Sequence, residues 1–136
     1  MRTAYLLDTD AVSDFIRYPT GGVATRLNAI GAESVAISIV TAAEIRFGMA
    51  RAQTHRLLAR MRSTLETVRI MALDPPADRH YADLRTYLEA RGTPIGANDM
   101  FIAAHALALD AILVTGNVRE FSRVPRLAVE NWIRPA

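Results

Sequence analysis

Short apolar runs recur along this chain, and segments with helical patterning separate them. The runs lie at residues 4–7, 35–40, 68–73 and 111–115, and a weaker one lies at 127–129. Each run has the length of a buried strand, and strands that alternate with helices form right-handed βαβ units. The pattern therefore predicts an α/β fold of three layers, in which a four- to five-stranded, mostly parallel sheet lies between helices.

The size and composition favour one compact domain over residues 1–136. Of the 136 residues, 51% are hydrophobic and 22% are charged, which is ordinary for a globular protein. No apolar run reaches the roughly 18 residues of a membrane span, and the N-terminus does not have the pattern of a secretory signal. Cysteine is absent, which excludes thiolate metal ligands and cysteine nucleophiles. We therefore expect no membrane association, and a cytoplasmic location is compatible with these features.

The basic residues are all of one kind, because the 16 positive side chains are arginines and lysine is missing. A guanidinium group binds phosphate through two parallel hydrogen bonds, so this usage suits a nucleic-acid partner. Codon bias from a GC-rich genome would explain it equally well. The absence of lysine has a firmer consequence, since it excludes a lysine Schiff base and a lysine phosphate anchor.

Three acidic residues fall where predicted strands end or the following helices begin. Asp8 ends the first apolar run, Glu44 lies in the first turn after the second, and Asp99 opens the helix that leads to the fourth. Because ligands of parallel sheets bind at the carboxyl ends of the strands, we expect these side chains to share one cleft. Gathered carboxylates repel one another unless a cation neutralises them, and oxygen ligands without cysteine suit Mg²⁺ or Mn²⁺. Such a site can activate water against a phosphodiester.

Each of these positions also has a structural interpretation. Asp99, or the asparagine before it, could cap a helix. Residues 41–44, ThrAlaAlaGlu, match a capping box that Glu44 would complete. The helix predicted over residues 9–16 would take Thr9 or Asp10 as its cap. Asp8 is harder to explain in this way, because a carboxylate that follows a buried strand is costly unless it is paired or faces a cleft.

Four segments together resemble a known family. They are LLDTD (6–10), TAAEIRFG (41–48), RGTPIGANDMFIAAHA (91–106) and LVTGNVREFSRVPRLAVENW (113–132), and they are similar to the PIN-domain ribonucleases and to the VapC toxins among them. The resemblance implies a Mg²⁺- or Mn²⁺-dependent endoribonuclease that cleaves tRNA or another structured RNA with metal-activated water. It also implies a cytoplasmic protein that a VapB-type antitoxin neutralises, and that forms homodimers or toxin–antitoxin hetero-oligomers.

The resemblance assigns the metal-binding, catalytic acids of the family to Asp8, Glu44 and Asp99. A fourth acidic position of the family falls on Asn117, whose amide oxygen can bind a cation or hold a water but adds no charge. A second metal ion would then bind more weakly, or only together with the substrate. Glu120 could supply the missing charge as a further ligand, or could be a solvated loop residue. Asp10, where the family often has asparagine, is either an outer ligand or the helix cap.

The segment between residues 46 and 69 is basic, with six arginines and one glutamate, for a local charge of +5. We predict that it binds the RNA backbone or the acidic tail of an antitoxin. The candidate side chains are Arg46, Arg51, Arg56 and Arg60. A solvated helix face is the alternative. His105 lies six residues after Asp99, on another face of the same helix, and is predicted to be a structural or a surface histidine.

Two other functions are compatible with parts of the pattern. LLDTD also resembles the D-x-D motif of haloacid-dehalogenase-type phosphohydrolases, in which the first aspartate is a nucleophile. That class needs a basic anchor, typically lysine, and a later acidic pair that this chain matches poorly. The other alternative is a PIN-like domain that binds RNA without cleaving it, because position 117 is asparagine.

Overall fold

Five short strands form one parallel sheet in the computed structural model, which describes residues 2–133. The strands are β1 (Tyr5–Leu7), β2 (Val35–Ser38), β3 (Arg69–Met71), β4 (Ile112–Val114) and β5 (Val129–Glu130). Their order is β3-β2-β1-β4-β5, and all four pairings are parallel. The first strand is therefore central, and the predicted parallel α/β sheet is confirmed.

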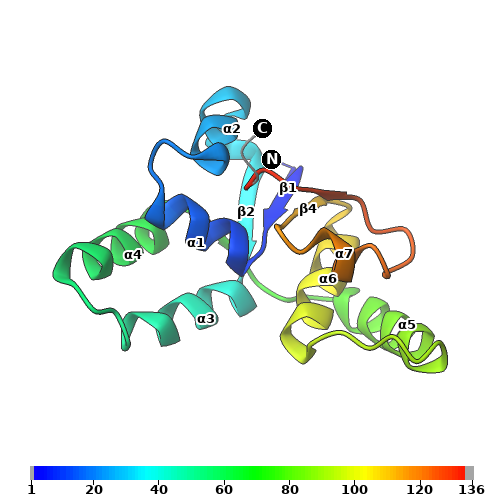
Figure 1. Cartoon of the computed structure of the whole chain (residues 1–136). Helices are drawn as coiled ribbons and strands as arrows, with labels where there is room; N and C mark the ends of the chain where they lie inside the picture. Colours follow the sequence, from blue (N-terminus) through cyan, green and yellow to red (C-terminus); the bar gives the residue numbers. More distant parts are fainter. Residues whose placement is uncertain (1, 134–136) are drawn as a thin grey trace.

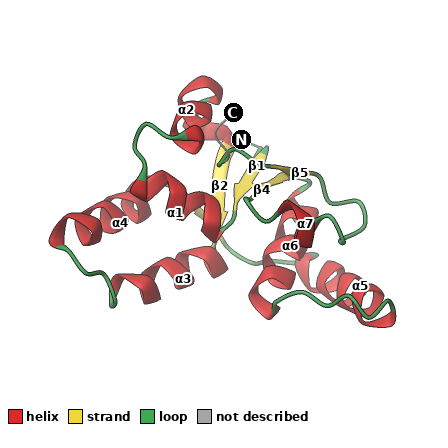
Figure 2. Cartoon of the chain, viewed as in Figure 1, coloured by secondary structure: helices red, strands yellow, loops and turns green. Residues whose placement is uncertain are grey.

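Helices cover both faces of this sheet (Figure 1). They are α1 (Thr9–Arg17), α2 (Gly22–Ile30), α3 (Ile39–Met49), α4 (His55–Thr67), α5 (Ala77–Ala90), α6 (Ala97–Leu109) and α7 (Val118–Phe121), with a 3₁₀ turn at Ala32–Ser34. Figure 2 shows α1 to α4 on one side of the strands and α5 to α7 on the other, which confirms the three layers. None of these helices, within residues 2–133, is long and apolar enough to cross a membrane.

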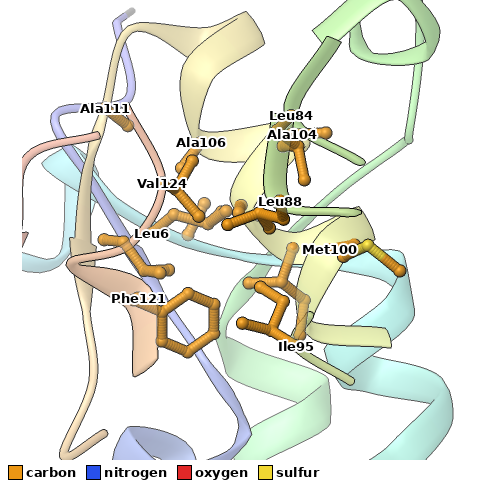
Figure 3. Packing of buried hydrophobic residues seen from close by; sticks show 14 residues of the cluster. Leu6, Leu84, Leu88, Ile95, Met100, Ala104, Ala106, Ala111, Phe121 and Val124 are labelled. Carbon is orange, nitrogen blue, oxygen red and sulfur yellow. The ribbon is translucent and has the colours of Figure 1, made fainter. Parts of the chain in front are cut away.

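Two hydrophobic cores form because side chains of a strand alternate between its faces. Leu6 of β1 and Leu113 of β4 are fully buried against the layer of α5 to α7, and Phe121 of α7 completes that core (Figure 3). Leu7 and Val114, the next residues on the same strands, lie in the second core with α1, α2 and α4. Burying each large side chain of this kind contributes about 1.5–3 kcal/mol, so the sheet is held firmly from both sides.

The start of α3 differs from the sequence-based expectation. Ser38, the last residue of β2, is the cap, and its hydroxyl accepts a hydrogen bond from the Val40 N–H at 3.0 Å. The predicted capping box of Thr41 and Glu44 is therefore wrong, because the helix has already begun and Thr41 is buried within it. Glu44 therefore does not cap α3.

The caps of α1 and α6 also differ from expectation. Asp8 caps α1, and its Oδ1 accepts a hydrogen bond from the Ala11 N–H at 3.0 Å. The caps predicted at Thr9 or Asp10 are wrong, since both residues lie inside the first turn. Helix α6 begins after Gly96 without any side-chain cap, so capping does not explain Asp99.

Candidate active site

Asp8 is fixed where β1 passes into α1. Its backbone N–H donates to the Val114 carbonyl of β4 at 2.9 Å, and its side chain is only 4% exposed. Burial raises the pKa of Asp8 to about 6, and the charge of Asp10 adds to that rise. Hydrogen bonds from the Thr115 side chain and from the Ala11 N–H lower the pKa and limit the rise. The carboxylate is thus held in place by two elements of the fold.

Glu44 reaches the same edge of the sheet from α3, and two side chains hold it. The Thr9 hydroxyl donates a hydrogen bond to Glu44 Oε1. The Asn98 amide donates to Glu44 Oε2 at 3.2 Å and so joins α6 to α3. Both oxygens of this carboxylate therefore have a neutral hydrogen-bond partner, and these two bonds fix the Glu44 side chain at the cleft.

Asp99 lies in the first turn of α6, where other carboxylates surround it. Burial raises its pKa first, and a hydrogen bond with Glu120 raises it further. The charges of Glu120, Asp8 and Glu44 act in the same direction, and together these causes bring the pKa of Asp99 to about 7. The acids predicted from the sequence are therefore gathered around Asp99, together with Glu120.

Glu120 comes from α7, a short helix that the sequence patterning does not predict. Its Oε1 is buried and has no hydrogen-bond partner among the described residues. Of the two interpretations of Glu120, the solvated loop residue is wrong, because the side chain is half-buried against Asp99.

Asn117 and Asp10 lie at the border of this cluster, and both are exposed. The Asn117 N–H donates to the Thr115 hydroxyl oxygen at 2.9 Å, and the Thr115 side chain hydrogen bonds with Asp8. A short chain of hydrogen bonds thus links the fourth family position to the first. Thr115 and Thr9 were not singled out from the sequence as holders of carboxylates, although each lies within two residues of a candidate ligand.

The cluster fits a divalent cation by the chemistry of its donors. Four carboxylates from different elements meet, two of them with raised pKa values, and none forms an ion pair with an arginine within residues 2–133. The partnerless Oε1 of Glu120 is a further donor for an ion. Among residues 2–133, no three acidic or histidine side chains are arranged so that they could hold a metal ion without moving. The site is therefore an acidic cleft whose ligands would draw together around a cation.

The predicted basic side chains fall into two groups. Arg46, Arg51 and Arg56 are exposed on α3, on the turn after it and on α4. Arg60 is half-buried, and its guanidinium donates to the carbonyls of Ile16 and Phe15 near the end of α1, the latter at 3.3 Å. Arg60 therefore joins α4 to α1, and the three exposed arginines are the ones available to a partner.

His105 is structural, as predicted. It is 1% exposed, and its Nδ1 lies 2.8 Å from the Ser38 hydroxyl. Because that hydroxyl oxygen already accepts from the Val40 N–H, its proton is free to point at Nδ1. Burial lowers the pKa of His105, so the ring is neutral at physiological pH.

Comparison with known proteins gives consistent matches over nearly the whole chain. The PIN domain family model matches residues 5–127. Ribonuclease VapC2 of Rickettsia felis is 33% identical over 94% of this chain and 97% of that relative. The tRNA(fMet)-specific endonuclease VapC of Salmonella typhimurium is 30% identical over 94% of this chain and 97% of that relative. The structure of VapBC2 from Rickettsia felis bound to a promoter DNA fragment superimposes with a TM-score of 0.86, at 32% identity, and covers 96% of this chain and 99% of that one.

Proposed function

The chain belongs to the PIN-domain family, as a ribonuclease of the VapC type, and we propose that it is a Mg²⁺- or Mn²⁺-dependent endoribonuclease of tRNA or another structured RNA in the cytoplasm. Ribonucleases of this family depend in general on a divalent metal. The dehalogenase alternative is set aside by the family match.

One observation supports the assignment of the site more than any other. The charges of Asp8, Glu44 and Glu120 all raise the pKa of Asp99, although these four acids come from four different helices or helix starts. A protein does not gather four unpaired carboxylates for stability, because their mutual repulsion and desolvation cost free energy. A bound divalent cation offsets that cost.

The residues of the chain then have distinct tasks in phosphodiester hydrolysis. When bound, the cation supplies activation of water and stabilisation of charge on the scissile phosphate. Asp8 and Asp99 would hold it directly. Glu44, held by Thr9 and Asn98, would bind it or orient a water. Glu120, which is hydrogen bonded to Asp99, would be an additional ligand.

We extend the same proposal to partners. A VapB-type antitoxin neutralises the enzyme, and the protein forms a homodimer or a toxin–antitoxin hetero-oligomer. The support is that the similar structure from Rickettsia felis is a VapBC2 complex. The exposed Arg46, Arg51 and Arg56 bind the RNA backbone or an acidic segment of the antitoxin. A short reading frame for a DNA-binding protein immediately upstream would support this arrangement.

The decisive experiment is incubation of the purified protein with total tRNA in the presence of Mg²⁺, Mn²⁺ or EDTA. We expect discrete fragments with either metal and none with EDTA. The Asp8→Asn variant is the control, and metal-dependent cleavage retained by it would refute the role of Asp8. A gel shift without fragments would favour an RNA-binding protein that does not cleave.

A further inference from the structure

A groove opens beside the acidic cleft, between α3 and α6. Its volume is about 830 Å³, and its lining includes Glu44 and Asn98, the pair that hydrogen bonds across the two helices. The same groove is lined by Phe47, Phe101 and Arg51. An RNA strand whose phosphate lies at the carboxylates would therefore place an adjoining nucleotide in this groove.

Phe47 forms part of the groove wall, and its ring is unusually exposed for a large hydrophobic residue. Its side chain is 66% exposed, more than any other large hydrophobic side chain among residues 2–133. Phe47 is three residues after Glu44, so the ring and the carboxylate lie on the same face of α3, roughly 5–6 Å apart at their Cβ atoms. That spacing is comparable to the length of one nucleotide. On the opposite wall, Phe101 is itself stacked on Tyr81, with ring centroids 4.3 Å apart and planes at 13°.

Arg51 supplies the positive charge that an RNA strand requires next to four carboxylates. Its guanidinium lies 5.5 Å from the centroid of the Phe47 ring. An exposed aromatic ring that stacks a base, beside an arginine that binds the phosphate, is the combination by which proteins hold single-stranded nucleic acid. An apolar side chain of a protein partner would use the ring but not the guanidinium.

We propose that this groove binds one unpaired nucleobase of the RNA substrate, adjacent to the scissile phosphate. The base stacks on Phe47, and Arg51 binds the neighbouring phosphate. The inference rests on the ribonuclease function proposed above and adds to it a subsite that favours unpaired over base-paired RNA at the cut.

The first test compares two aromatic–arginine pairs of the same design. Tyr87 of α5 is 40% exposed and has the Arg91 guanidinium 5.2 Å from its ring centroid, but it does not line the groove. With a tRNA that the wild-type protein cleaves, we expect Phe47→Ala to raise KM by roughly 10-fold or more and to leave kcat within about 3-fold. Phe47→Tyr keeps a stacking ring and should restore KM. Tyr87→Ala should change neither constant.

The second test detects stacking directly. Trp132 is the single tryptophan and is only 5% exposed, so a Phe47→Trp substitution adds the one exposed indole. In an Asp8→Asn background that does not cleave, titration with the same tRNA and Mg²⁺ should quench the added emission strongly. A Tyr87→Trp protein in the same background should show no comparable quenching.

The outcomes separate this inference from the function on which it rests. An unchanged KM in Phe47→Ala, or equal quenching from both tryptophan positions, would overturn the nucleotide subsite while cleavage by the wild type stands. Light scattering that shows Phe47→Ala dissociating an oligomer, with activity lost only through dissociation, would also overturn it, because the ring would then be an interface between subunits. Quenching at position 47 without any cleavage by the wild type would support the groove and refute the nuclease.

Discussion

The β1–α1 junction and the start of α6 each bring an aspartate to the cleft, and they do so by different means. Asp8 is built into the fold: it caps a helix and hydrogen bonds with Thr115. Asp99 caps nothing, and its side chain hydrogen bonds with another acid, Glu120. Both carboxyl groups have a raised pKa. Hydrogen bonds oppose the rise at Asp8, whereas burial and the acids Glu120, Asp8 and Glu44 all add to the rise at Asp99. Asp8 is positioned by the fold, whereas the surroundings of Asp99 favour a bound cation or a bound proton.

The largest expected effect comes from Asp99→Asn. Cleavage of tRNA with Mg²⁺ should fall by roughly 100-fold or more, which is typical when one electrostatic contributor to a transition state is removed. The melting temperature without metal should stay the same or rise, because the substitution removes charge repulsion and no cap. Cleavage assays and thermal unfolding of the same sample measure both. A variant that unfolds at lower temperature would show that Asp99 stabilises the fold.

The second prediction concerns pH and metal. The pKa values of Asp8 and Asp99, about 6 and about 7, lie above the ordinary value of 3.8, so the native state keeps protons that the unfolded chain has released. The free energy of unfolding without metal should therefore fall as the pH rises from about 4 to about 7. Mg²⁺ competes with those protons, so it should raise the melting temperature more at about pH 8 than at about pH 5. Equal shifts at both pH values would contradict this account.

The third prediction separates the two tasks of Asp8. Asp8→Asn keeps a good helix cap and loses the charge, whereas Asp8→Ala loses both. Both variants should lose most of their cleavage activity, but only Asp8→Ala should lose about 1 kcal/mol of unfolding free energy. Chemical denaturation in EDTA compares them. Equal stability would mean that the bond from the Ala11 N–H does not stabilise α1.

The smallest effect is expected from Glu120→Gln, which tests how much the charge of Glu120 raises the pKa of Asp99. Without the charge of Glu120, the pKa of Asp99 should fall toward its ordinary value, and apparent Mg²⁺ affinity should change by only a few-fold. Asn117→Asp is the matched opposite, because it adds a carboxylate at the exposed end of the Thr115 hydrogen-bond chain. Metal titrations of cleavage rate should then move in opposite directions for the two variants.

The sequence predicted the layers, the parallel sheet and the edge at which the acids meet, because strand length and alternation with helices depend on local patterning. It misplaced features that depend on packing. Thr41 and Glu44 match a capping box, yet Ser38 starts the helix since β2 ends earlier than its apolar run. Helix α7 is too short to show a period, so the position of Glu120 was open. The groove at Phe47 was missed because its walls come from helices far apart in sequence.

The central place of β1 has a consequence for synthesis. Its two neighbours are β2, which follows soon after it, and β4, which lies near the other end of the chain. Asp8 and Glu44 therefore leave the ribosome long before Asp99 and Glu120 do. A growing polypeptide that lacks α6 and β4 can pair β1 with β2 and β3, but the other side of β1 has no partner and the acids are not yet gathered. The strand order thus keeps the acidic cluster incomplete until α6, β4 and α7 have been synthesised.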